Sequence, residues 1–406
     1  MKNNTTLHGY NPMPLCDSHI HIHHSDRAGL PITIDDTCTF IKNLMIYFSY
    51  DRLNIQALTP YGGALDLAIN AKALYCKAKL NKQFAPERQV YVNANLMHVF
   101  NTGLSPEEEL LRQAKVAYAA GFDGIKLLDG KPIFRRQLGY GLNDSRYEPF
   151  LQFVIEHDFP LVLHTGDPHE MWEESVDSNG VKQPPHFDSS FVTMPQLRDE
   201  LEQMLEKHPM LKITLAHFYF WGAELEQLSA FLDRYPNVCL DIVPACEEFF
   251  DLNKDPATAR EFFIRYSDRI LFGSDCNNWH SSESLDEYQH CFGNIINLPR
   301  NYLEAKAPFR FVDNDRGEIT PLQLEEEYLK KIYHDNFVRI YGETARPVNY
   351  DLALEIVNEV APIYNDPSTI IFPDREKFGG LEFTSLASRE INVKNLETMA
   401  QFFETK

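Results

Sequence analysis

The stretch Leu15-Cys16-Asp17-Ser18-His19-Ile20-His21-Ile22 decides how this chain is read. Polar and apolar residues alternate along it, and this period of two predicts a β-strand rather than a helix. Residues two positions apart on a strand point to the same face, about 7 Å from one another. His19 and His21 therefore lie side by side, where two imidazoles can converge on one metal ion, and Asp17 shares their face. Such a pair also occurs by chance and in satisfied cores, so the rest of the chain must support the metal interpretation.

Strands and helices alternate along most of the chain. Ser105-Pro106-Glu107-Glu108 is the clearest helix start, and that helix should run to Ala120 and stop at Gly121. Strict alternation indicates a parallel sheet, and eight strand–helix units between residues 15 and 342 fit a (β/α)8 TIM barrel better than an open α/β sheet. No Gly-x-Gly-x-x-Gly follows the first strand, which removes the main dinucleotide signature. The expected strands cover residues 17–22, 54–58, 90–97, 123–128, 161–164, 211–217, 238–243 and 270–275.

The end of the chain lies outside the eight units. We expect residues 1–342 to form the barrel domain and residues 343–406 to form a helical C-terminal extension packed on it. Tyr350 to Tyr364 and Asn392 to Glu404 have helical patterns, with a connection rich in Pro, Asp and Gly between them. The extension has few residues from which to build a separate core, so we expect it to share the core of the barrel.

Composition narrows the class of protein. The formal net charge of −21 argues against nucleic acid as a partner, because a polyanion would be repelled and no basic patch is visible. The polar segment Met1 to Tyr10 lacks the apolar core of a signal peptide, and no run is long and apolar enough for a membrane span. The 7 cysteines show no CxxC pair or regular spacing, which is typical of free thiols in a reducing compartment. We therefore expect a cytoplasmic protein.

Polar residues end several of the expected strands. His164 ends the fifth strand, His217 the sixth and Asp275 the eighth, each after an apolar run. The carboxyl ends of all strands of a barrel converge on one mouth, so these three residues should meet His19 and His21 there. Imidazoles and a carboxylate are ligands that zinc, manganese and iron prefer. One of these histidines alone would more often be a core or capping residue, but chance placement of all of them at strand ends is hard to sustain.

Short motifs at these positions are similar to those of a known family. The chain resembles the amidohydrolase superfamily, and more closely its amidohydrolase-related group, which includes aminocarboxymuconate-semialdehyde decarboxylase and the resorcylate decarboxylases. The resemblance covers roughly residues 12–342. Its motifs are Asp17-x-His19-x-His21, His164-Thr165-Gly166, Ala216-His217 and Phe272-Gly273-Ser274-Asp275, with support from Gly121 to Leu127 and from Asp335-Asn336-Phe337.

The resemblance implies a (β/α)8 barrel that holds one divalent metal ion, commonly zinc, with manganese or iron as the alternatives. By this resemblance His19, His21, His164 and Asp275 are the metal ligands. His217 is either a further ligand or, as we prefer, the acid–base group beside the metal. Asp275 also has a catalytic role, because a carboxylate next to the metal can take the proton of an attacking water.

Lys126 raises the question of a second metal ion, since a carboxylated lysine on strand four bridges two metals in binuclear relatives. In the group that this chain resembles, a lysine in a Gly-x-Lys-Leu context is usually not a bridge, so the resemblance implies a mononuclear site. Lys126 then either binds an anionic group of the substrate or pairs with Asp123 or Asp129.

The leading interpretation is a metal-dependent hydrolase that attacks the carbonyl group of a small amide, lactone or carbon–carbon substrate. A non-oxidative decarboxylase of an aromatic or unsaturated acid is the first alternative, because it would use the same ligands. A non-catalytic metal-binding barrel is the second. The partner we expect is a small-molecule substrate, and the frequency of dimers among relatives leaves a homo-oligomer open.

Aromatic residues follow the strands that carry the polar ones. Trp172 comes after His164, Trp221 after His217 and Trp279 after Asp275, so all three are candidates for an aromatic pocket wall suited to a planar or cyclic substrate. Packing of loops against the barrel rim explains them equally well. Arg27, beyond the first strand, is a candidate partner for a substrate carboxylate, although a surface ion pair is its more ordinary role.

Overall fold

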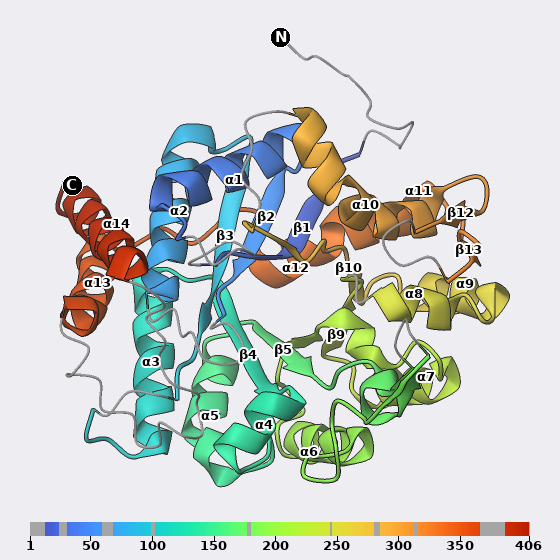
Figure 1. Cartoon of the computed structure of the whole chain (residues 1–406). Helices are drawn as coiled ribbons and strands as arrows, with labels where there is room; N and C mark the ends of the chain where they lie inside the picture. The colour runs from blue at the N-terminus through green and yellow to red at the C-terminus, as the bar shows by residue number, and fades with distance from the viewer. Residues whose placement is uncertain are drawn as a thin grey trace.

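The computed structural model describes residues 13–23, 31–58, 68–98, 102–176, 180–243, 246–279, 285–311, 316–365 and 386–405. A sheet of nine parallel strands forms the centre, with helices around it (Figure 1). The strands follow one another in the order β10-β9-β8-β5-β4-β3-β2-β1-β11. Their bounds are β1 (Cys16–His21), β2 (Arg52–Gln56), β3 (Gln89–Asn95), β4 (Gly124–Gly130), β5 (Leu161–Thr165), β8 (Ile213–Leu215), β9 (Val238–Asp241), β10 (Ile270–Leu271) and β11 (Cys276–Asn277).

The two strands at the ends of this order, β10 and β11, are the two halves of one segment. Residues 272–275 connect them and carry the sheet from β9 to β1. Across this seam the Ser18 N–H donates to the carbonyl of Phe272 at 2.9 Å, and the Asp275 N–H donates to the carbonyl of His19 at 2.8 Å. Counted as one strand, β10 and β11 form the eighth strand of the barrel. The sheet therefore closes on itself with eight strands, which confirms the predicted (β/α)8 barrel.

Helices occupy each connection between successive strands of the barrel, as a barrel of parallel strands requires. Two small antiparallel hairpins, β6 with β7 and β12 with β13, are added to the loops. The helices are α1 (Ile34–Tyr47), α2 (Ile69–Phe84), α3 (Pro106–Ala120), α4 (Pro132–Leu138), α5 (Glu148–Glu156), α6 (Met194–Lys207), α7 (Leu225–Arg234), α8 (Cys246–Leu252), α9 (Pro256–Arg265), α10 (Leu285–Glu304), α11 (Glu326–Lys330) and α12 (Asn336–Tyr341). The hairpin strands are β6 (Ser175–Val176), β7 (Lys182–Gln183), β12 (Phe309–Arg310) and β13 (Glu318–Ile319).

Local sequence explains why α3 begins and ends where it does. The Ser105 hydroxyl accepts a hydrogen bond from the Glu108 N–H, and the Glu108 carboxylate accepts one from the Ser105 N–H. Gly121 ends the helix in the left-handed conformation, with φ of 94°. Both predicted boundaries are confirmed, because capping chemistry is local.

Two parts of the fold differ from the expectation. The eighth strand was predicted to run unbroken over 270–275, but 272–275 leave the ladder between β10 and β11. The helical pattern from Leu324 to Tyr341 predicts one helix that ends at Gly342, but the structure divides it into α11, a π-helical turn at Lys331–Asp335 and α12. The buried Asn336 amide at the start of α12 donates to the carbonyls of Ser267 and Ile270, at 2.8 and 2.7 Å, so tertiary hydrogen bonds fix this segment.

The C-terminal extension forms two helices, α13 (Tyr350–Asn365) and α14 (Leu386–Glu404), that lie beside α2 and α3 (Figure 1). Their apolar side chains belong to the same buried cluster as the barrel helices. Polar contacts add to this packing, since Lys72 of α2 donates to the Asn392 amide oxygen at 3.1 Å. In the described part of the chain, no helix combines the length and the apolar character needed to cross a membrane.

Candidate metal centre

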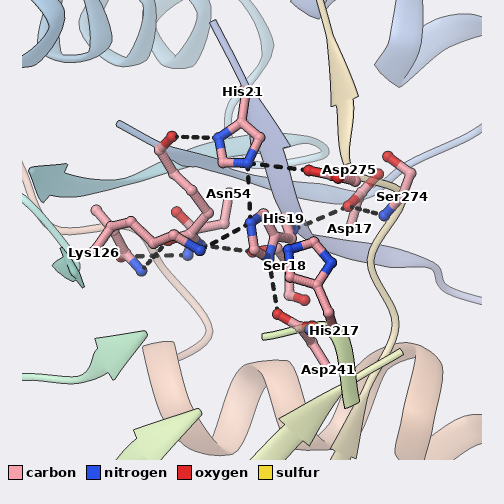
Figure 2. Close-up of polar contacts among 12 residues, drawn as sticks. Asp17, Ser18, His19, His21, Asn54, Lys126, His217, Asp241, Ser274 and Asp275 are labelled. Carbon is pink, nitrogen blue, oxygen red and sulfur yellow. Dashed lines mark hydrogen bonds and ion pairs between the residues drawn. The ribbon is translucent and has the colours of Figure 1, made fainter. Parts of the chain in front are cut away.

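Strand β1 places two imidazoles side by side at the mouth of the barrel. The Nε2 atoms of His19 and His21 lie 3.1 Å apart, and His21 Nε2 lies 3.1 Å from the Asp275 carboxylate. Among the described residues, these three form the group of His, Cys, Asp or Glu donors that could share one metal ion, with their ligand atoms within 4.8 Å of each other. We call His19, His21 and Asp275 the three-donor group. Figure 2 shows His19 at its centre, between His21, Lys126 and Asp241.

The second nitrogen of each ring fixes where its proton lies. His21 Nδ1 is 2.8 Å from the carbonyl oxygen of Gln56, and His19 Nδ1 is 2.8 Å from the Asp241 carboxylate. Because a carbonyl and a carboxylate only accept hydrogen bonds, both Nδ1 atoms carry the proton. Both Nε2 atoms therefore present lone pairs to one another at 3.1 Å, which is unfavourable unless a cation lies beside them. This donor set fits a divalent metal ion.

Lys126 of β4 supplies a positive charge at this point. Its Nζ lies 3.1 Å from His19 Nε2, so the ammonium can donate to the lone pair that a metal ion would use. Burial lowers the pKa of Lys126 to about 8, while the charges of Asp241 and Asp275 oppose that shift. The structure thus places Lys126 against the three-donor group, and neither Asp123 nor Asp129 is its hydrogen-bond partner: Asp123 pairs with Lys77, and Asp129 with His98.

Asp275 lies in the segment between β10 and β11 and has a left-handed backbone, with φ of 56°. Gly273 lets this segment pass close to β1, because a Cβ there would come within 3.0 Å of the His19 Cβ. Burial would raise the pKa of Asp275, but the His21 ring at 3.1 Å and the neighbouring imidazoles hold the pKa well below its usual range. Asp17 stands behind the group, where its carboxylate accepts hydrogen bonds from the backbone N–H groups of His19 and Ser274, both at 3.1 Å.

His217 follows β8 in an uncommon turn. Four consecutive non-glycine residues, 217–220, have positive φ values between 46° and 60°. The His217 ring lies beside His19 and His164, with centroids 5.7 and 4.7 Å away. Its Nδ1 is buried without a hydrogen-bond partner, and burial lowers the pKa of His217 to about 4. A neutral imidazole therefore faces the three-donor group.

His164 ends β5 but lies outside the three-donor group. Its Nε2 is 3.1 Å from the carbonyl of Gly166 and 3.3 Å from Lys131 Nζ. Lys131 also forms an ion pair of 2.6 Å with Asp167. Burial holds the pKa of His164 well below its usual range. The structure thus brings His164 next to His217, with ring centroids 4.7 Å apart.

The candidate substrate residues fall in different places. Trp279 stacks on His23, with ring centroids 4.9 Å apart, and His23 in turn lies 6.4 Å from the His21 ring. Trp172 packs on Phe187 within the loop after β5. Trp221 packs against the guanidinium of Arg198 of α6, 3.9 Å from the ring centroid. Arg27 lies outside the described residues.

Several residues that complete the site were missed from the sequence. Asp241 interrupts an apolar strand, Val-Cys-Leu-Asp-Ile-Val, and that break in the pattern could have been noticed. Gln56 acts through its backbone carbonyl, for which no sequence signal exists. Lys131 lies between the end of β4 and the start of α4, and no sequence pattern marks it as part of a site.

Residues 76–342 match the family described as Amidohydrolase. No curated protein matches the sequence. Among solved structures, the chain is similar to an uncharacterised TIM-barrel protein of Bordetella bronchiseptica, with 13% identity, a TM-score of 0.48 and coverage of 82% of this chain and 99% of the other. It is also similar to 4-oxalomesaconate hydratase of Rhodopseudomonas palustris (16%, 0.44, 85% and 99%) and to 2,6-dihydroxybenzoate decarboxylase of Rhizobium (16%, 0.45, 81% and 98%).

Proposed function

The chain belongs to the amidohydrolase family, and on that premise we propose that it is a metal-dependent enzyme that hydrolyses a small carbonyl compound. The observation that carries the proposal is the pair of imidazole lone pairs that face each other at 3.1 Å beside a carboxylate. Both Nδ1 protons are committed to other partners, so the two Nε2 atoms face the site, and a metal ion has to displace only the Lys126 ammonium from His19.

We propose that His19, His21 and Asp275 hold one divalent ion, with His164 as the predicted fourth ligand. Zinc suits two or three imidazoles and a carboxylate best, and manganese or iron are the alternatives. When bound, the ion supplies a Lewis acid that polarises a carbonyl group and lowers the pKa of water towards neutrality. Lys126 is already committed to His19 by a hydrogen bond, which favours one metal ion over a bridged pair.

The residues of the chain divide the proton transfers between them. Asp275 is the base that accepts the proton of the attacking water. His217 is neutral and has a ring nitrogen free of protein partners, so it can hydrogen-bond to the carbonyl oxygen as charge develops or pass a proton to the leaving group. The left-handed turn holds its ring beside His19 rather than pointing it out of the barrel.

We propose a planar or cyclic substrate. The stacked His23 and Trp279 rings stand next to His21 and offer a flat aromatic surface at the edge of the metal site. Lys126 can donate to an anionic group of the substrate once a metal ion has displaced its contact with His19.

The test begins with the metal content of the purified protein. We expect close to one equivalent of zinc, manganese or iron, and less than about half an equivalent would overturn the metal site. The holoenzyme is then assayed on lactones, amides and aromatic acids, with detection of both hydrolysis products and CO2.

Asp275→Asn should reduce hydrolysis by at least about 100-fold while the far-UV circular dichroism spectrum is unchanged. Release of CO2 without hydrolysis would assign the decarboxylase alternative. A metal-loaded protein that turns over none of these classes would support a non-catalytic barrel.

A further inference from the structure

We propose that Asp241 is a positioning residue that sets both the metal-binding form of His19 and the place of His217. The inference rests on the proposed metal site and extends it to a residue whose side chain lies one layer behind the ligands. Asp241 is the last residue of β9 and is 1% exposed. Figure 2 shows it below His19 and beside His217.

The two oxygens of the Asp241 carboxylate have different partners. Oδ2 accepts the Nδ1 proton of His19 at 2.8 Å, and Oδ1 accepts the backbone N–H of His217 at 2.8 Å. One side chain therefore connects His19 of the three-donor group, on β1, with the acid–base candidate His217, which follows β8. The strands β1 and β8 are not neighbours in the sheet. This arrangement links the ring of His19 to the backbone of His217.

The bond to His19 decides which nitrogen faces the metal site. A carboxylate can only accept, so His19 must keep its proton on Nδ1 and leave Nε2 bare. The bond to His217 acts on the backbone, because it satisfies a buried N–H at the first residue of the left-handed turn. Without an acceptor at this point, the turn would have to find another partner for that N–H.

Replacement of Asp241 by asparagine separates these two effects. The amide has one oxygen and one NH2 group, so it can accept from only one of the two donors. The backbone N–H of His217 cannot change its chemistry, whereas His19 can move its proton to the other nitrogen. We therefore expect the amide oxygen to stay on His217 and the NH2 group to face His19, which drives the His19 proton onto Nε2 and blocks the metal site.

The experiment compares wild-type protein, Asp241→Asn and a matched control, all after removal of metal by a chelator. The control is Asp129→Asn, because Asp129 is a second buried carboxylate at the mouth that contacts a histidine, His98, at 2.7 Å and lies outside the three-donor group. Zinc affinity is measured by competition with a chromophoric chelator. The tautomer of His19 is read from long-range 1H–15N correlation spectra of the metal-free proteins, with the His19→Gln spectrum as the assignment.

We expect the zinc affinity of Asp241→Asn to fall about 10- to 100-fold and that of Asp129→Asn to stay within about twofold of wild type. The wild-type spectrum should show His19 protonated on Nδ1. Wild-type affinity in a folded Asp241→Asn protein would overturn the inference. If that variant does not fold, a wild-type His19 protonated on Nε2 would overturn it instead. Failure of the wild-type protein itself to bind zinc would overturn the proposed function, which keeps the two outcomes distinct.

Discussion

Glu248 is a single residue whose buried carboxyl group lowers the stability of the folded protein at neutral pH. Its side chain is 4% exposed and accepts a hydrogen bond from the Gly222 N–H at 2.9 Å. Burial raises the pKa of Glu248 well above its usual range, and the charges of Asp251, Glu170 and Glu247 add to the shift. The folded protein therefore keeps this proton at pH values where the unfolded chain has lost it, so its stability falls as the pH rises above about 4.3.

Glu248→Gln should remove this penalty and keep the hydrogen bond from Gly222. We expect the free energy of unfolding to rise by roughly 1–3 kcal/mol at pH 8 and to change little at pH 4.5, where roughly half of the unfolded chains still carry this proton and the penalty is small. Urea unfolding at the two pH values measures both numbers. An equal gain at pH 4.5 and pH 8 would show that the charge of Glu248 is not the cause.

Lys126 is the residue that most directly competes with a metal ion. Lys126→Met keeps the length of the side chain and removes the ammonium that lies 3.1 Å from His19 Nε2. We expect metal affinity at pH 7 to rise by about tenfold, because the repulsion between the ammonium and a divalent ion is lost. Titration with zinc should still give one equivalent. A fall from two equivalents to one or none would instead show that Lys126 bridges two ions.

Among the secondary-structure elements, the eighth strand of the barrel, which consists of β10 and β11, does most to shape the site. Its break between β10 and β11 allows Asp275 to turn towards His21, and Gly273 allows the segment to lie against β1. Gly273→Ala would place a Cβ 2.7 Å from the Val243 side chain and 3.0 Å from the His19 Cβ. The neighbours on both sides would have to move.

We expect Gly273→Ala to lower the free energy of unfolding by about 1–3 kcal/mol and the metal affinity by roughly tenfold or more. Gly293→Ala is the matched control, since its new Cβ would meet only side-chain atoms at 3.8 Å within α10. That change should leave metal affinity unchanged and stabilise the helix slightly. Calorimetric zinc titration of both variants decides the point, and equal affinities would contradict the steric argument.

Elements could be predicted from the sequence where their causes are local. The capping box of α3 lies within four residues, and the alternation of strands and helices was enough to predict the barrel. The break between β10 and β11 could not be predicted, because Ile270 to Asp275 has the pattern of an apolar strand and its left-handed residue, Asp275, is not a glycine. The turn 217–220 could not be predicted either, because all four residues have positive φ values and none of them is a glycine.

The site shows the same division. His19, His21 and Asp275 were predicted together because strand ends of a barrel share one mouth, and the structure places them in one group. The orientation of His164 depends on Lys131 and on the carbonyl of Gly166, which are contacts of the following loops. Such contacts are set by tertiary structure, so a sequence pattern can place a residue at the mouth without fixing where its ring points.

At the scale of the whole molecule, the question is whether the C-terminal extension and the barrel unfold as one unit. Phe403 of α14 is 1% exposed, and its ring contacts Tyr75 of α2 and Tyr350 of α13, at centroid distances of 6.3 and 5.5 Å. About two turns earlier in α14, the Asn395 amide oxygen accepts a hydrogen bond of 2.9 Å from the Ile34 N–H at the start of α1. These contacts tie α14 to the first two helices of the barrel.

Phe403→Ala therefore tests whether the C-terminal extension and the barrel unfold together. Loss of this ring from a shared core should cost about 3–5 kcal/mol and lower the melting temperature of a single transition by several degrees. Gln401→Ala, an exposed change on the same helix, should leave the melting temperature within about one degree of wild type. Differential scanning calorimetry distinguishes the alternatives. If the extension were a separate unit, a small early transition would appear in Phe403→Ala and the main transition of the barrel would stay in place. A shared core requires instead that the whole transition moves, because the apolar faces of α2, α13 and α14 are buried against one another.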